Sequence, residues 1–223
     1  YLPDGLNNNY RYKNLAFAEW REMYHAGKLS GAAKQFFNPK PNEMLFDCDA
    51  DPHQVNNLAG KPEHAAVLAE LRQRLQEIVK EMPDLSFYPE SYLAEHAMSN
   101  PVAFGQNHKS EIAALVDIAD LALLPFKKAR PGILAALNSE DPMRRYWGSM
   151  VCTAFGEDAS EMTEDAKRLL NDPSLIVRVR AAEFLGRIGA INPQTTLTEV
   201  VNTTKNSVEA TEALNSVVWF KDF

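Results

Sequence analysis

The chain has 223 residues, of which 45% are hydrophobic and 24% charged, as in an ordinary globular protein. Its formal net charge is −7 and its Lys and Arg form no positive stripe, so nucleic acid and anionic membranes are not expected as partners. No apolar run reaches transmembrane length, so no membrane span is expected. The two cysteines lie too far apart for a disulfide scaffold or a zinc site.

The N-terminal part is predicted to mix helices with one strand. Residues 14–27 predict a helix that Asn14 caps and Gly27 ends, and a short second helix falls within 30–41. The apolar run "EMLFD", residues 43–47, follows two prolines and is the best strand candidate. The first residues show neither an initiating Met nor a signal-peptide pattern, so a longer parent chain is expected.

The strongest helix prediction covers residues 62–82. Pro62 suits the first helical turn and Pro83 ends the pattern. Apolar residues recur there at three- and four-residue spacing: Val67, Leu68, Leu71, Leu75, Ile78, Val79 and Met82. A short helix is predicted over 90–98, and Ser, Asn, Pro and Gly in 99–107 indicate a linker.

The remaining sequence predicts helices separated by short polar loops, which favours antiparallel neighbours. The blocks are 108–123, 130–139, 142–155, 160–171, 174–189, 193–204 and 207–219. Two stretches, 137–156 and 170–189, repeat with a spacing of 33 residues. The second, "DPSLIVRVRAAEFLGRIG", resembles the second helix of a HEAT repeat, whereas the signatures of ankyrin and tetratricopeptide repeats are absent. The period is short for HEAT repeats, so the α-solenoid architecture is the firmer part of the prediction.

The stretch "LFDCDADPHQVNN" has the residue types of a metal or catalytic site. Asp47, Asp49 and Asp51 match the first half of a calcium-binding EF-hand loop, but Pro52 replaces the required Gly and Leu58 the required Glu. Calcium binding by that route is therefore not expected.

The same stretch holds Cys48 and His53, which could be a nucleophile and its base. Neither an oxyanion-hole Gly cluster nor a third orienting residue accompanies them. The favoured interpretation is a polar turn in which Asp side chains cap the backbone. Cys48→Ala would decide between the two.

Other polar and aromatic residues have structural interpretations. Three tryptophans lie at helical-pattern positions and are predicted to be core residues: Trp20, Trp147 and Trp219. Four arginines line equivalent helices of the two repeats: Arg144, Arg145, Arg178 and Arg180. They could form a ridge for an anionic partner, but the interspersed Glu and Asp favour ion pairs within each repeat.

The segment from residue 43 to the helix after Pro62 closely resembles the C-terminal segment of arylsulfatase-type sulfatases. The matching residues are 45–47, 51–53 and 56–59, with Phe46 where Tyr is usual and Gln54 where Glu is common. Residues 19–37 and 85–90 also resemble bacterial sulfatases whose tails continue into HEAT-like repeats. In that family the motif ends a small C-terminal sheet and begins the helix that packs on it.

The resemblance implies the hydrolysis of sulfate esters, but not by this chain. The family uses a formylglycine made from Cys in C-x-P-S-R or C-x-A-G-R, together with a calcium ion. Asp-Ala-Asp-Pro follows Cys48 and Thr-Ala-Phe-Gly follows Cys152, so neither motif is present. The prediction for catalytic, cofactor-binding and metal-binding residues is therefore none, and a sulfatase parent would be periplasmic or secreted.

The predicted fold is mainly α: a HEAT-like α-solenoid of antiparallel helix pairs, preceded by a small α+β segment. Residues 1–98 would be the remnant of a sulfatase C-terminal subdomain, 99–107 a linker and 108–223 the repeats. The expected partners are the missing catalytic domain and another protein or a sulfated glycan. An apolar surface near Leu15, Phe17, Leu45 and Phe46 is expected where that domain packs. The alternative is a free-standing HEAT-like module that binds another protein.

Overall fold

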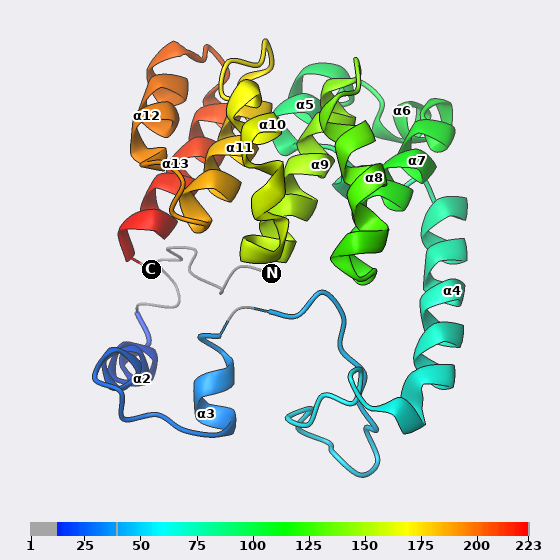
Figure 1. Cartoon of the computed structure of the whole chain (residues 1–223), viewed down its shortest axis with the longest axis vertical. Coiled ribbons are helices and arrows are strands. Elements are labelled where there is room, and N and C mark those ends of the chain that lie inside the picture. Colours follow the sequence, from blue (N-terminus) through cyan, green and yellow to red (C-terminus); the bar gives the residue numbers. More distant parts are fainter. Residues whose placement is uncertain (1–12, 39, 223) are drawn as a thin grey trace.

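The computed structural model describes residues 13–38 and 40–222, with no account of the side chains of 221 and 222. The described part is mostly helical and has no strand. Figure 1 shows α5 to α13 side by side, with α4 at one edge leading down to the 45–60 loop. The mainly α fold class is confirmed. None of the helices in the described ranges is long and apolar enough to cross a membrane.

The first two helices form a small aromatic cluster. Helix α2 (Leu15–His25) is capped by Asn14, whose side chain accepts a hydrogen bond from the Ala16 amide. Helix α3 (Ala32–Gln35) lies against it, and the Trp20 indole donates to the Ala33 carbonyl at 2.9 Å. The aromatic rings that meet there are Phe17, Trp20, Tyr24, Phe36 and Phe37. Both helix predictions are confirmed, and Trp20 belongs to this cluster.

The strand predicted at 43–47 is wrong. The segment is extended but forms no strand ladder with another described residue. The Leu45 carbonyl accepts from the Leu58 amide at 2.8 Å, and the Leu45 amide donates to the Asn57 side chain at 2.9 Å. A side chain thus takes the place of a partner strand on this edge, so the β pattern has no sheet to join.

The helix predicted at 62–82 is confirmed. A 3-10 turn, η1 (Pro62–His64), leads into α4 (Ala65–Glu81), and Pro83 follows. Its outer apolar residues are not covered, which makes this helix central to the candidate site below.

The segment predicted as a linker is largely helical. After η2 (Leu85–Phe87) and α5 (Glu90–His96), helix α6 spans Pro101–Asn107. The Asn100 side chain accepts from the Ala103 amide, and Pro101 begins the helix, so Asn-Pro acts as a helix start. Gly105 is buried, and a Cβ there would lie 3.2 Å from the Pro83 carbonyl oxygen, so the close packing leaves little room for a side chain. These small and polar residues were interpreted as a loop but form a helix, and whether the segment separates two domains remains a prediction.

The helical array consists of α7 to α13 and holds the main core. Its elements are α7 (Lys109–Ala119), η3 (Asp120–Leu123), α8 (Phe126–Leu137), α9 (Pro142–Phe155), η4 (Gly156–Met162), α10 (Thr163–Leu169), α11 (Leu175–Arg187), α12 (Pro193–Thr203) and α13 (Ser207–Asp222). Helices α8, α9, α11, α12 and α13 pack successively on one another. Fully buried side chains include Ile112, Ile133, Leu137, Phe184, Leu185 and Leu197. The α-solenoid class remains a prediction.

Helix α13 returns to pack on α5. The Glu212 carboxylate accepts from the Glu90 amide at 3.0 Å and from the Ser91 hydroxyl at 2.7 Å. Because Pro89 gives α5 no side-chain cap, Glu212 supplies one from a distant helix. The chain before residue 98 therefore shares contacts with the C-terminal helix, and the domain limits remain a prediction.

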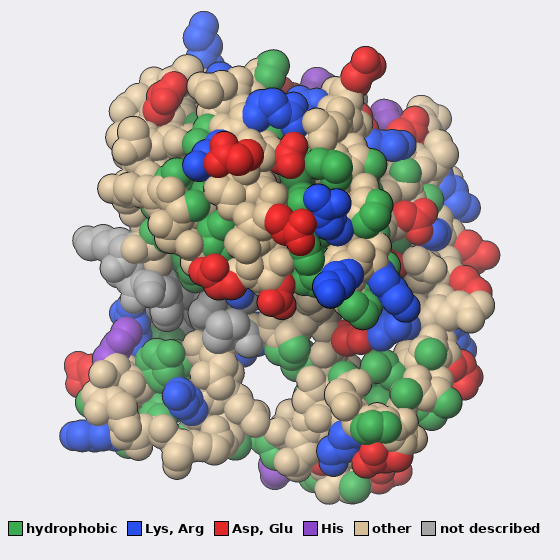
Figure 2. All heavy atoms as spheres, in the orientation of Figure 1, with side chains coloured by type: hydrophobic (Ala, Val, Ile, Leu, Met, Phe, Trp, Pro, Cys, Tyr) green, Lys and Arg blue, Asp and Glu red, His purple; other side chains and the backbone are tan. Residues whose placement is uncertain are grey.

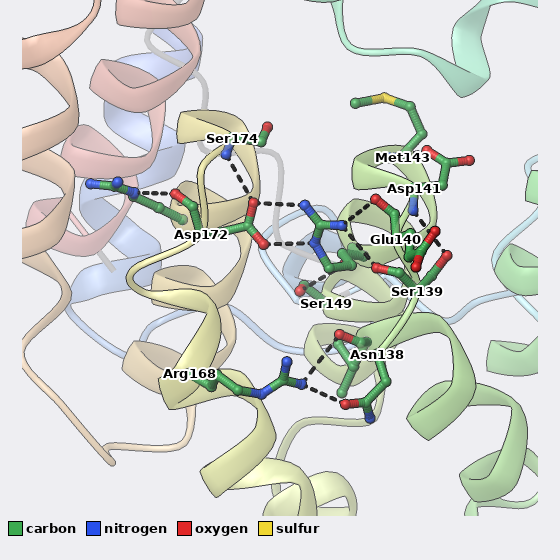
Figure 3. Close-up of polar contacts among 12 residues, drawn as sticks. Asn138, Ser139, Glu140, Asp141, Met143, Ser149, Arg168, Asp172 and Ser174 are labelled. Atoms are coloured by element: carbon green, nitrogen blue, oxygen red, sulfur yellow. Dashed lines mark hydrogen bonds and ion pairs between the residues drawn. The ribbon is translucent and has the colours of Figure 1, made fainter.

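The two repeat units are joined by a bidentate ion pair. Arg145 Nε and Nη2 donate to the Asp172 carboxylate at 2.6 and 2.9 Å, and Arg145 Nη1 donates to the carbonyls of Ser139 and Glu140 (Figure 3). The Ser174 amide also donates to Asp172. This pair links two units, whereas ion pairs within a unit were predicted.

The other arginines also have partners. Arg144 lies 3.7 Å from Asp141, and Arg180 donates to Glu183 at 2.7 Å, so these two pairs within a unit are as predicted. Arg178 Nε donates to the Asp172 carbonyl at 2.6 Å. The arginines therefore stabilise the array and do not form an open ridge.

Candidate functional site

The 45–60 loop is a series of Asx turns. The Asp47 carboxylate accepts from the amides of Asp49 and Ala50, each at 3.1 Å. The Asp51 carboxylate accepts from the Asn56 amide at 2.7 Å, and this bond is the main cause of its lowered pKa. The polar-turn interpretation is confirmed for these aspartates, whose oxygens face their own backbone.

The two cysteines lie in different surroundings. Cys48 is exposed and accepts a weak hydrogen bond from Gln54 Nε2 at 3.7 Å, and it shares none with His53. Cys152 is buried, and that burial raises the pKa of its thiol to about 12, which keeps it protonated at neutral pH. Within 13–38 and 40–222, no group of three His, Cys, Asp or Glu is placed to hold a metal ion.

The most unusual feature of the surface is an apolar stripe on α4. We define the α4 stripe as five residues that lie on one side of the helix: Val67, Leu71, Leu75, Ile78 and Met82. Their exposed fractions range from 46% to 62%. Figure 2 shows hydrophobic side chains gathered over the lower part of α4 and the neighbouring loop. Soluble monomers rarely leave such a row of large apolar side chains exposed, and it is typical of an interaction site.

The other side of α4 is attached to the array and to the 41–43 segment by polar contacts. Arg72 Nε and Nη2 donate to the Glu43 carboxylate at 3.0 and 2.5 Å, and this pair raises the pKa of Arg72. Gln76 Nε2 donates to Asp120 at 2.7 Å. Further along the helix, Lys80 pairs with Asp117. These contacts fix which side of α4 faces away from the array.

A pocket of about 380 Å³ lies between α4 and the array. Its apolar walls come from five helical elements, α4, η2, α7, η3 and α9, and we call its polar lining residues the rim. The wall residues include Leu75, Val79, Phe87, Trp147, Met150 and Val151, and the rim residues are Asn42, Glu43, Arg72, Gln76 and Asp120. Leu75 belongs both to the α4 stripe and to this pocket, so the two apolar surfaces are continuous.

The extended 43–47 segment has one open edge. Leu45 uses its amide and carbonyl toward Asn57 and Leu58. The amides and carbonyls of Met44 and Phe46 make no hydrogen bond with other residues in the described ranges. Because backbone groups alternate along an extended chain, these groups form the opposite edge, which is open to another strand.

The apolar surface was predicted in a different place. Leu15 is 85% exposed, whereas Phe17, Leu45 and Phe46 are half-buried. The spacing of the α4 apolar residues predicts a helix but does not assign them to a surface. The resemblance to a family in which this helix packs on a sheet was the signal that could have identified them, since no sheet is present among the described residues.

Comparison with known proteins gives one informative match. No family model matches the chain, and no solved structure matches it. Part of the chain is similar to a sulfatase. A "Ulvan-active sulfatase" of Formosa agariphila is 37% identical over 94 residues, which are 42% of this chain and 15% of that protein. The matched part thus spans less than a sixth of the relative's length, and it supports a sulfatase-like relation.

Proposed function

We propose that this chain is the non-catalytic C-terminal region of a sulfatase, a sulfuric ester hydrolase, and that it buttresses the catalytic domain. The observation that carries the proposal is the uncovered α4 stripe in a chain that is partly similar to a sulfatase. A helix with this pattern gains stability only when its apolar side is covered. Covering the exposed half of each stripe residue would contribute about 1 kcal/mol apiece.

The open edge of the 43–47 segment supports the same proposal. The free amides and carbonyls of Met44 and Phe46 could add this segment to a sheet of the catalytic part. The sheet would then lie where the first turns of α4 begin, which agrees with the family resemblance. The segment would complete the sheet, and the α4 stripe would pack on it.

The catalytic groups of such an enzyme would lie outside this chain. In this family, formylglycine would supply the nucleophile for the sulfate ester, and a calcium ion would assist it. The described residues do not fit these groups: Cys152 is buried and Cys48 lies in an Asx turn without the required motif. Asp47 and Asp51 already accept hydrogen bonds from their own loop.

We propose that the helical array is a HEAT-like α-solenoid with a surface for a partner or a large sulfated substrate such as a glycan. The successive packing of α8, α9, α11, α12 and α13 supports this. So does the link between the two repeats through Arg145 and Asp172. A free-standing HEAT-like interaction module is the alternative, and it would be expected to begin with a polar capping helix, whereas α4 carries an apolar stripe.

The proposal is tested by comparing the chain with the native protein that contains it. The native protein would be recovered from its source cells with an antibody against residues 108–223, and its intact mass and hydrolysis of 4-nitrophenyl sulfate measured. We expect a mass well above 25.0 kDa and activity that is lost on chelation, with no activity from the chain alone. Turnover by the chain alone, or a native protein of 25.0 kDa, would contradict the proposal.

A further inference from the structure

The pocket between α4 and the array has the size and lining of a binding site. Its volume of about 380 Å³ falls in the range that holds a large side chain or a small ligand. Trp147 lies in its wall and is held in place because its indole Nε1 donates to the Phe87 carbonyl at 2.8 Å. Met150 also lines the wall and can adapt to different shapes. The pocket is therefore largely preformed.

The charged side chains at the rim differ in whether they have an ion-pair partner. Arg72 pairs with Glu43, and Lys80 pairs with Asp117, so both cations that face Asp120 already have closer carboxylate partners. Among the described residues, only the neutral Gln76 side chain donates a hydrogen bond to the Asp120 carboxylate. Asp120 is half-buried, and this burial raises the pKa of its carboxyl. The rim thus holds one negative charge without a cation of its own.

We propose that this pocket binds a protein segment that presents a large apolar side chain next to an Arg or Lys. The apolar side chain would fill the space beside Trp147 and Met150, and the cation would pair with Asp120. The same carboxylate would repel a sulfate group, which separates this pocket from any surface that holds a sulfated substrate. The cation of the ligand would thus balance the negative charge of the Asp120 carboxylate.

The segment belongs to the part of the sulfatase that covers the α4 stripe, and this assignment rests on the proposed function. Leu75 joins the stripe to the pocket, so whatever covers the stripe also reaches the pocket rim. Binding in the pocket would attach the array, as well as α4, to the catalytic domain. The two charges would fix the register of that contact.

The chemistry of the pocket is tested with peptides that differ in one side chain. The probes are acetylated, amidated Gly-Phe-Arg-Gly, Gly-Phe-Gln-Gly and Gly-Phe-Glu-Gly, titrated into the full chain. Binding is followed by the indole N–H resonance of Trp147, with those of Trp20 and Trp219 as internal references. We expect the Arg peptide to shift the Trp147 resonance and to bind about tenfold more tightly than the Gln peptide, with the Glu peptide weakest.

Matched variants assign the effect to the pocket. Asp120→Asn should make the Arg and Gln peptides bind equally, whereas Glu81→Gln, on an exposed carboxylate of α4 outside the pocket, should preserve the difference. Ala154→Leu should weaken all three peptides by filling the pocket, and Ala122→Leu replaces it if that variant does not fold. Equal binding of the Arg and Gln peptides to the unmodified chain, or no shift of the Trp147 resonance, would overturn the proposal.

The test separates this inference from the proposed function. Preferential binding of the Arg peptide supports the pocket chemistry whatever the parent protein is. If the native protein then proves to be no sulfatase, the catalytic domain is excluded as the source of the segment. If the native protein is a sulfatase and the peptides do not discriminate, only the pocket proposal fails.

Discussion

The N-terminal region and the helical array are built from similar amphipathic patterns but differ in what covers them. Among the described residues from 13 to 82, Phe37 alone is buried, although α4 has one of the clearest apolar patterns in the chain. In the array, most of the apolar face of α11 is inaccessible to solvent. The difference teaches that periodicity predicts a helix, whereas burial depends on a partner surface that another segment must supply.

The largest effect is expected from a cavity in the array. Leu185→Ala removes a fully buried side chain from α11 and should cost about 2–5 kcal/mol of unfolding free energy. Leu71→Ala, on the α4 stripe, and Lys127→Ala, on the surface, should each cost less than about 1 kcal/mol. Urea unfolding of the three variants measures the contrast, and equal losses would show that the two regions do not differ in packing.

Loss of the ion pair between the repeats should have an effect of similar size. Asp172→Ala leaves Arg145 nearly buried without its carboxylate and should cost about 3–5 kcal/mol. The matched control is Glu161→Ala, which removes the exposed partner of Arg130 and should cost less than about 1 kcal/mol. If thermal or urea unfolding shows equal losses of stability in the two variants, the Arg145–Asp172 pair does not stabilise the contact between the repeats.

Polar substitutions on the α4 stripe should change its surface but not its stability. The double variant Leu71→Gln with Ile78→Gln should keep the unfolding free energy within about 0.5 kcal/mol. It should also reduce the fluorescence of a bound naphthalenesulfonate dye, because the dye binds exposed apolar surface. The control is Glu70→Gln with Glu77→Gln on the same helix. A loss of stability comparable with that of Leu185→Ala would mean that the stripe is already covered.

The smallest effect concerns the charge of Asp120. Because burial raises its pKa, the folded state binds this proton more tightly than the unfolded state, and stability falls as the pH rises through the raised pKa. Asp120→Asn should therefore stabilise the chain at pH 7 by less than about 1 kcal/mol, since the group is half exposed. The gain in stability should vanish at about pH 3, where the Asp120 carboxyl is protonated and neutral, as the Asn side chain is at every pH. A gain that is larger at pH 3 than at pH 7 would contradict this sign.

Local signals explain what the sequence could predict. The helices predicted from residues 142 and 193 begin there, each after a capping side chain: Asp141 accepts from the Met143 amide and Asn192 from the Gln194 amide. Such caps depend on neighbours within three residues, so they can be read from sequence. The same signal at Asn100-Pro101 was outweighed by the surrounding Ser and Gly, so the helix that begins at Pro101 was not predicted.

The candidate site depends on contacts between distant segments, which the patterns do not contain. Gln76 meets Asp120, and the Asn42 side chain donates to the Ala122 carbonyl at 2.7 Å across 80 residues. These contacts decide which side of α4 faces outward and create the pocket. The Asx turns of the 45–60 loop could be predicted because they are local. The position of the apolar surface could not be predicted from the helix pattern alone, since it depends on how α4 is attached.

The central claim is that the α4 stripe is covered in the native protein, and methionine oxidation tests it most directly. Met82 lies on the stripe, whereas Met98 is exposed elsewhere and serves as the control. The isolated chain and the native protein from source cells would be treated with hydrogen peroxide, and oxidation at each Met measured by peptide mass spectrometry. We expect Met82 to oxidise about tenfold more slowly in the native protein than in the chain, with Met98 unchanged. Equal rates for Met82 in the two samples would contradict the account.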